Sequence, residues 1–185
     1  FNSNIFYALE LTVFLFAWLV LLGAGYAAKK TLHLGVDAIF KLAQPSVKRM
    51  LGLFVVAICI AYSLLLLKGS WDYWAPFANL PPTEGRWFPL GFVEKFRGQG
   101  WYETQDLPVP FFLTWLADVF NDGEAYEKLP KVVPYIVLPI SMALLTYRFA
   151  QAAVRIWRGE QESLIVSHEA EDEVAEAAAR LKEQN

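Results

Sequence analysis

Few residues in this chain have the type and spacing that chemistry requires. The sequence contains two histidines, His33 and His168, and a single cysteine, Cys59. One cysteine excludes an intramolecular disulfide and a thiolate metal cluster, and neither histidine lies in an apolar segment where a bundle could hold a haem. No phosphate-binding loop, nucleophile elbow or HExxH zinc motif occurs. We therefore predict no catalytic, cofactor-binding or metal-binding residues, and no enzyme activity.

Two acidic positions still need an explanation. Glu10 is the one ionisable residue inside a long apolar segment, about five residues or roughly 7 Å from its start. Such a carboxylate can face a protein partner, reach the membrane interface or couple to an ion, and all three interpretations stay open. His33 and Asp37 are four residues apart, so they can pair on one helix face. That pair would either fix helix geometry or relay a proton.

Three apolar segments are long enough to cross a membrane. Residues 50–67 contain no charged residue and would form a helix about 27 Å long, close to the roughly 30 Å hydrocarbon core of a bilayer. Residues 5–28 carry only Glu10, and residues 132–147 carry no charge. A composition of 56% hydrophobic and 19% charged residues favours membrane spans over buried helices of a soluble domain. The first segment is too long for a signal-peptide core, so we expect it to remain in the mature chain.

The charges between the spans predict their orientation. The connection between the first two spans has five basic residues and one acid, Asp37, which is typical of a cytoplasmic loop. Residues 68–131 have six Lys or Arg against nine Asp or Glu and are expected outside. Arg148, Arg155 and Arg158 follow the last span and place the C-terminus in the cytoplasm. Residue 1 is then expected outside.

These patterns divide the chain into four predicted parts. Residues 1–67 are membrane helices with a basic cytoplasmic loop, 68–131 an extracytoplasmic insertion, 132–158 the final membrane helix and 159–185 an acidic cytoplasmic tail helix. The tail is rich in strong helix formers, and its acids precede Arg180 and Lys182. It is either a solvated helix or a docking element.

The insertion is too rich in aromatic residues for a flexible linker. Trp71, Tyr73 and Trp74 are predicted to form an aromatic belt at the outer membrane boundary. Residues 111–120 have helical apolar spacing and predict a short helix, which lies on the membrane surface or packs on a protein. The frequent Gly and Pro residues make long strands unexpected.

The opening residues 1–39 resemble the small membrane subunit of tripartite ATP-independent periplasmic (TRAP) transporters. The matching residues are Phe1-Asn2, Glu10, Trp18, Gly23-Ala24, His33, Val36 and Asp37. Ala8 and Leu9 replace the Trp and first Glu that are usual in the family. Residues 106–153 resemble the C4-dicarboxylate branch, which has a long external insertion before its last span.

The resemblance implies a scaffold subunit that braces a large permease subunit in the bacterial inner membrane. A periplasmic binding protein would deliver an organic anion, such as a C4-dicarboxylate, for uptake with sodium. Family members have four spans, and this chain begins where their first span ends. A stand-alone multispan adaptor and a membrane redox subunit remain the alternatives.

We expect membrane lipid and these two proteins as partners, and no nucleic acid. Two sets of candidate interaction residues follow. The predicted subunit interface comprises Glu10, Trp18, His33 and Asp37. The insertion is expected to be a platform for the binding protein or simply a cover over the span ends. The predicted docking residues are Asp118, Asp122, Glu124 and Glu127.

Overall fold

The computed structural model describes residues 6–29, 45–89, 99–159 and 180. Its contacts divide the chain into two units. Unit 1 comprises Phe1–Gly25 and Ala61–Thr146, and unit 2 comprises Tyr26–Ile60 and Tyr147–Asn185. Each unit is considered by itself below.

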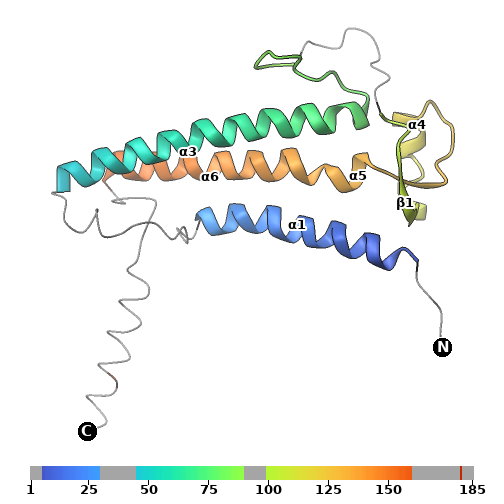
Figure 1. Cartoon of the computed structure of the whole chain (residues 1–185), viewed down its shortest axis with the longest axis horizontal. Coiled ribbons are helices and arrows are strands. Elements are labelled where there is room, and N and C mark those ends of the chain that lie inside the picture. Colours follow the sequence, from blue (N-terminus) through green and yellow to red (C-terminus); the bar gives the residue numbers. More distant parts are fainter. Residues whose placement is uncertain (1–5, 30–44, 90–98, 160–179, 181–185) are drawn as a thin grey trace. The chain divides into compact units, whose positions relative to one another are not determined.

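Three long apolar helices dominate the fold (Figure 1). They are α1 (Ala8–Lys29), α3 (Pro45–Trp74) and α6 (Val137–Arg158). With the short helix before α6, they give three stretches long and apolar enough to cross a membrane, Ala8–Ala28, Val47–Ala78 and Val132–Arg158. The predicted fold class, an all-α membrane protein with three spans, is confirmed.

The second helix is longer than its apolar stretch. Helix α3 has 30 residues, which corresponds to about 45 Å and exceeds the roughly 30 Å hydrocarbon core. Its last turn carries Trp71, Tyr73 and Trp74, the residues predicted to form the aromatic belt. These rings therefore extend from the end of the helix itself.

The last span begins with an interrupted helix. Helix α5 (Val132–Tyr135) and α6 are separated at Ile136. Pro139 explains the break because it has no N–H to donate to the carbonyl of Tyr135 and its ring crowds that carbonyl. The carbonyl of Tyr135 therefore receives no helical hydrogen bond from residue 139.

The insertion forms short elements within unit 1. They are the 3-10 helices η1 (Ala75–Ala78) and η2 (Phe111–Leu113), the helix α4 (Leu116–Phe120), and the strands β1 (Glu103–Pro108) and β2 (Lys128–Pro130). The strands pair antiparallel, with Glu103 opposite Pro130 and Pro108 opposite Lys128. This small sheet was not anticipated from the sequence. The helix predicted over residues 111–120 is divided into η2 and α4.

A compact apolar core joins the insertion to the helices of unit 1. Phe77, Ala78 and Val132 are buried at its centre. The partly buried side chains packed around them come from α3, the insertion and α5: Trp74, Leu80, Tyr102, Phe120, Val133 and Tyr135. The prediction that the insertion is not a flexible linker agrees with this packing.

In unit 2, basic side chains gather at the end of α6. The guanidinium of Arg49 donates a hydrogen bond to the carbonyl of Trp157, and Arg155 and Arg158 lie in the last turn of the helix. Cations at this end complement the helix dipole. Gly159 then ends the helix with φ of 78°, a left-handed conformation that favours glycine.

Candidate interaction surfaces

Glu10 joins the first span to the insertion. It lies in the first turn of α1, and its two carboxylate oxygens accept hydrogen bonds from the backbone N–H groups of Gln105 (3.0 Å) and Asp106 (2.8 Å). Both donors belong to β1. The structure shows a contact within the chain that was not among the three interpretations left open, because the carboxylate satisfies two backbone donors of a strand. The prediction that Glu10 lies at a subunit interface stays a prediction.

Two tryptophans bind the carbonyls of α5. The indole N–H of Trp18, from α1, donates to the carbonyl of Pro134 at 2.8 Å. The indole of Trp74, at the end of α3, donates to the carbonyl of Val132 at 2.9 Å. The single turn of α5 thus receives hydrogen bonds from α1 and from α3.

Tyr135 lies at the centre of an aromatic cluster beside these bonds. Its ring centroid is 5.9 Å from Phe14, 5.5 Å from Tyr73 and 5.2 Å from Phe77, within the range of favourable aromatic pairs. Next to it is an apolar cavity of about 770 Å³ lined by α1, α3, α5 and α6, with Phe14 and Tyr135 in its wall. The helices of unit 1 therefore leave an apolar groove beside Tyr135.

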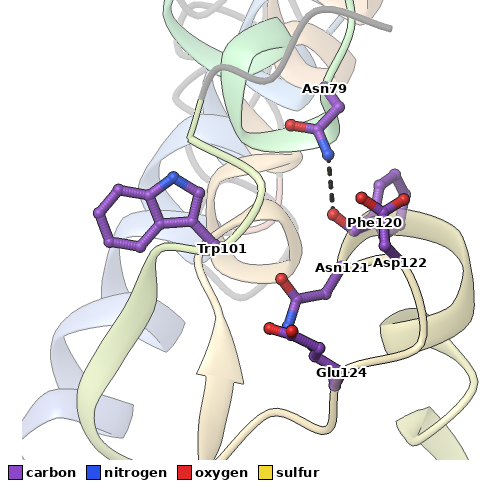
Figure 2. Close-up of a pocket in the computed structure, with 6 residues that line it drawn as sticks. All are labelled: Asn79, Trp101, Phe120, Asn121, Asp122 and Glu124. Atoms are coloured by element: carbon purple, nitrogen blue, oxygen red, sulfur yellow. Dashed lines mark hydrogen bonds between the residues drawn. The ribbon is translucent and has the colours of Figure 1, made fainter.

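A second cavity, here called the acidic cavity, lies in the insertion. It has a volume of about 280 Å³ and is lined by Asn79, Trp101, Phe120, Asn121, Asp122 and Glu124. Figure 2 shows the Trp101 ring on one side and the polar side chains of residues 121–124 on the other. Asn79, with φ of 53°, donates to the carbonyl of Phe120 at 2.7 Å and closes one end.

The structure brings together two of the four predicted docking acids. Asp122 and Glu124 line the acidic cavity. Asp118, which precedes them in the sequence, and Glu127, which follows them, are also exposed. The turn that presents Asp122 has φ of 54° there and 88° at Gly123. The prediction for this set concerned a partner protein and stays a prediction.

Tyr126 and Glu103 stabilise the turn between α4 and β2. Glu103 accepts hydrogen bonds from the backbone N–H groups of Glu127 (2.9 Å) and Lys128 (3.2 Å). The Tyr126 hydroxyl donates to the carbonyl of Gly100 at 2.6 Å. Burial and the nearby Glu103 carboxylate raise the pKa of Tyr126 to about 12. The hydroxyl is therefore a donor at physiological pH.

The structure shows further anchors that the sequence reasoning missed. Asp72 accepts from Lys68 (2.9 Å) and from both the backbone N–H (2.5 Å) and the hydroxyl (2.7 Å) of Thr83. The spacing of four residues between Lys68 and Asp72 could have predicted their ion pair on one helix face. In unit 2, Arg148 donates to Gln151 at 2.8 Å, and Gln151 donates to the hydroxyl of Tyr147 at 2.9 Å.

Two predicted residues cannot be compared with the structure. His33 and Asp37 lie outside the described residues, as does the tail apart from residues 159 and 180. Within the described ranges, no group of three or more His, Cys, Asp or Glu side chains could hold a metal ion.

Comparison with known proteins agrees with this architecture. Residues 1–92 match the family described as tripartite ATP-independent periplasmic transporters, DctQ component. A Vibrio cholerae protein named C4-dicarboxylate TRAP transporter small permease protein DctQ is 46% identical over 183 residues, which cover 99% of this chain and 71% of that protein. A Pseudomonas aeruginosa protein of the same name is 32% identical over 162 residues, covering 88% of this chain and 60% of that protein. No solved structure matches the chain.

Three apolar helices and a folded insertion define a multi-pass membrane protein. The chain belongs to the DctQ-component family of TRAP transporters. The resemblance expected from the sequence is confirmed. Because the relatives are named as small permease proteins of transporters, the family is not one of enzymes, as predicted.

Proposed function

We propose that this chain is the small permease subunit of a C4-dicarboxylate TRAP transporter in the bacterial inner membrane. The observation that carries the proposal is its 46% identity, over 99% of its length, to a Vibrio cholerae protein of that name. In the proposed complex, a periplasmic binding protein delivers the dicarboxylate to a large permease subunit, which moves it together with sodium. The C-terminus of the chain is in the cytoplasm.

The role of this chain within the complex is that of a scaffold. The charged residue within the Ala8–Ala28 span is Glu10, and its carboxylate is already bound to β1. A substrate or sodium site in a membrane needs clustered polar groups, which a carboxylate used in this way does not provide. Helix α1 instead exposes large apolar side chains such as Leu9, Phe16 and Leu19. The exposed side chains favour α1 as a contact face for the large subunit. Glu10 and Trp18 hold the same helix in place through their hydrogen bonds to β1 and α5.

The insertion is the proposed platform for the binding protein. Asp122 and Glu124 line the acidic cavity together with the exposed Trp101, and Glu127 is an exposed acid three residues further along the chain. Acidic groups at the rim of an interface raise the association rate of a partner that carries basic groups. The attraction weakens with salt because the screening length is about 8 Å at physiological ionic strength.

Charge reversal tests this platform. We expect the triple variant Asp122→Lys, Glu124→Lys, Glu127→Lys to need several-fold more binding protein for half-maximal dicarboxylate uptake, with assembly of the membrane complex unchanged. The matched control is Glu84→Lys, an exposed acid on a separate turn of the insertion. The measurement is uptake into proteoliposomes as binding protein is titrated at low and at physiological salt.

Three results would count against parts of the proposal. Unchanged uptake in the triple variant would remove the docking role, and loss of assembly would make the acids structural. If the wild-type complex takes up no C4-dicarboxylate with its binding protein, the proposed substrate class is wrong.

A further inference from the structure

The insertion carries an apolar ridge, defined here as Phe111, Phe112, Trp115 and Val119. These side chains are 87%, 61%, 53% and 52% exposed. The rings of Phe111 and Phe112 pack edge to face with centroids 5.5 Å apart, so they form one surface. Residues 107–117 contain no charged residue. Exposed apolar side chains that gather in this way mark contact with a membrane or another protein.

The bonds of Glu10 tie the strand that precedes this ridge to the start of the first span. Helix α1 begins at Ala8, so Glu10 lies roughly 3 Å along the axis from the start of the span. Since its carboxylate holds the N–H groups of Gln105 and Asp106, β1 is held beside the first turn of α1, where the apolar stretch Ala8–Ala28 begins. Figure 1 shows β1 running toward the start of α1. The ridge begins at Phe111, three residues after β1 ends.

We propose that the apolar ridge is immersed in the lipid–water interface of the leaflet in which α1 begins. The bilayer is the favoured occupant because the ridge follows a strand that is bonded to the end of a membrane span. Its composition also fits, since aromatic rings, and Trp above all, prefer the headgroup level. Exposed Asp118, next to Val119 on α4, carries the charge that must remain on the aqueous side.

Immersion gives the insertion a further attachment to the membrane, besides the end of α3 and the start of α5. The acidic cavity follows α4 directly, because Phe120 and Asn121 are part of its lining. A fixed ridge therefore holds that cavity at a constant height above the bilayer. This inference needs neither the docking role nor the substrate class, so it can fail or succeed independently of both.

Depth-dependent quenching tests the proposal. In a Cys59→Ser background, Phe112→Cys is labelled with an environment-sensitive nitrobenzoxadiazole dye. The full chain, alone and together with the large subunit, is placed in nanodiscs of phosphatidylethanolamine and phosphatidylglycerol. The quenchers are lipids with a nitroxide high on the acyl chain, and iodide in the water. Val119→Cys is a second ridge position, which keeps the test valid if Phe112→Cys does not fold. Glu127→Cys, an exposed acid beyond the cavity, is the matched control.

We expect the nitroxide lipid to quench both ridge positions several-fold more than the control, with and without the large subunit, and iodide to quench the control preferentially. Quenching of the ridge by iodide alone would overturn the proposal, because the ridge would then face water. Protection from both quenchers when the large subunit is present would also overturn it, since a protein would then cover the ridge.

Discussion

At the scale of single residues, polar side chains that reach backbone groups hold this chain together. Glu10 binds two N–H groups of β1, Trp18 and Trp74 bind carbonyls of α5, and Asn79 binds the carbonyl of Phe120. Backbone groups near a membrane need partners because an unsatisfied group costs several kcal/mol in lipid. Each of these side chains therefore stabilises a specific junction between elements.

Glu10→Gln tests the most distinctive of these junctions. The amide keeps one acceptor oxygen but directs an NH2 group at a backbone donor, and it removes the charge that strengthens both bonds. A loss of about 1.5 kcal/mol, the lower end of the range for hydrogen bonds to charged groups, corresponds to slightly more than tenfold faster exchange of the amides of Gln105 and Asp106. Hydrogen exchange with mass spectrometry measures this, with Glu84→Gln as the matched control. Unchanged protection would show that Glu10 does not hold β1.

Tyr126 predicts how the insertion responds to alkaline pH. Its pKa is raised to about 12, whereas an unfolded tyrosine titrates near 10. A raised pKa means that its contribution to stability is complete below about pH 10 and is lost as the pH rises toward 12. The difference between the ultraviolet titrations of wild type and Tyr126→Phe isolates this phenol. Ionisation of that phenol near pH 10 would contradict the hydrogen-bonded, half-buried position.

At the scale of elements, the packing of α1 on α6 within unit 1 depends on one glycine. A Cβ atom at Gly25 would lie 2.9 Å from Cδ2 and 3.1 Å from Cγ of Leu144, so α1 approaches α6 closely there. Gly23, two residues earlier on the same helix, has open space around the equivalent position. Small residues allow such close approach between membrane helices.

The two glycines form a matched pair for a test. We expect Gly25→Leu to destabilise the chain by about 1–3 kcal/mol through overpacking against Leu144. Gly23→Leu should be neutral or slightly stabilising, because it gains helix propensity without a clash. The measurement is the midpoint of thermal unfolding of each purified variant in detergent. Equal midpoints for the two variants would contradict the close contact.

At the scale of the whole molecule, the proposed orientation places the insertion and the basic connection on opposite sides of the membrane. In a Cys59→Ser background, Ala125→Cys should react with a membrane-impermeant thiol reagent added to cells with a permeable outer membrane. Ser46→Cys should react only after the inner membrane is disrupted. Ala125 is exposed, whereas Thr104 in β1 is buried, so residue 125 is the better reporter of the insertion. Labelling of Ser46→Cys in intact cells would invert the orientation.

The sequence by itself determined the three spans and the family. Apolar character over some twenty residues is a local property, so residues 5–28, 50–67 and 132–147 could be recognised without knowledge of their neighbours. The aromatic content likewise predicted a folded insertion. The family followed from short motifs around Glu10, Trp18 and Gly23-Ala24, which the comparison with known proteins then confirmed.

Only the tertiary structure decided what these residues touch. Glu10 binds donors 95 and 96 positions away, and Trp18 binds a carbonyl 116 positions away. The pairing of β1 with β2, and the cavity that joins Asn79 and Trp101 to Asp122, depend in the same way on the path of the chain. Helical periodicity fixes neighbours three and four residues apart. Contacts between distant segments depend on how the helices and the insertion pack together, so residue types and spacing could propose Glu10 as important but could not name its partner.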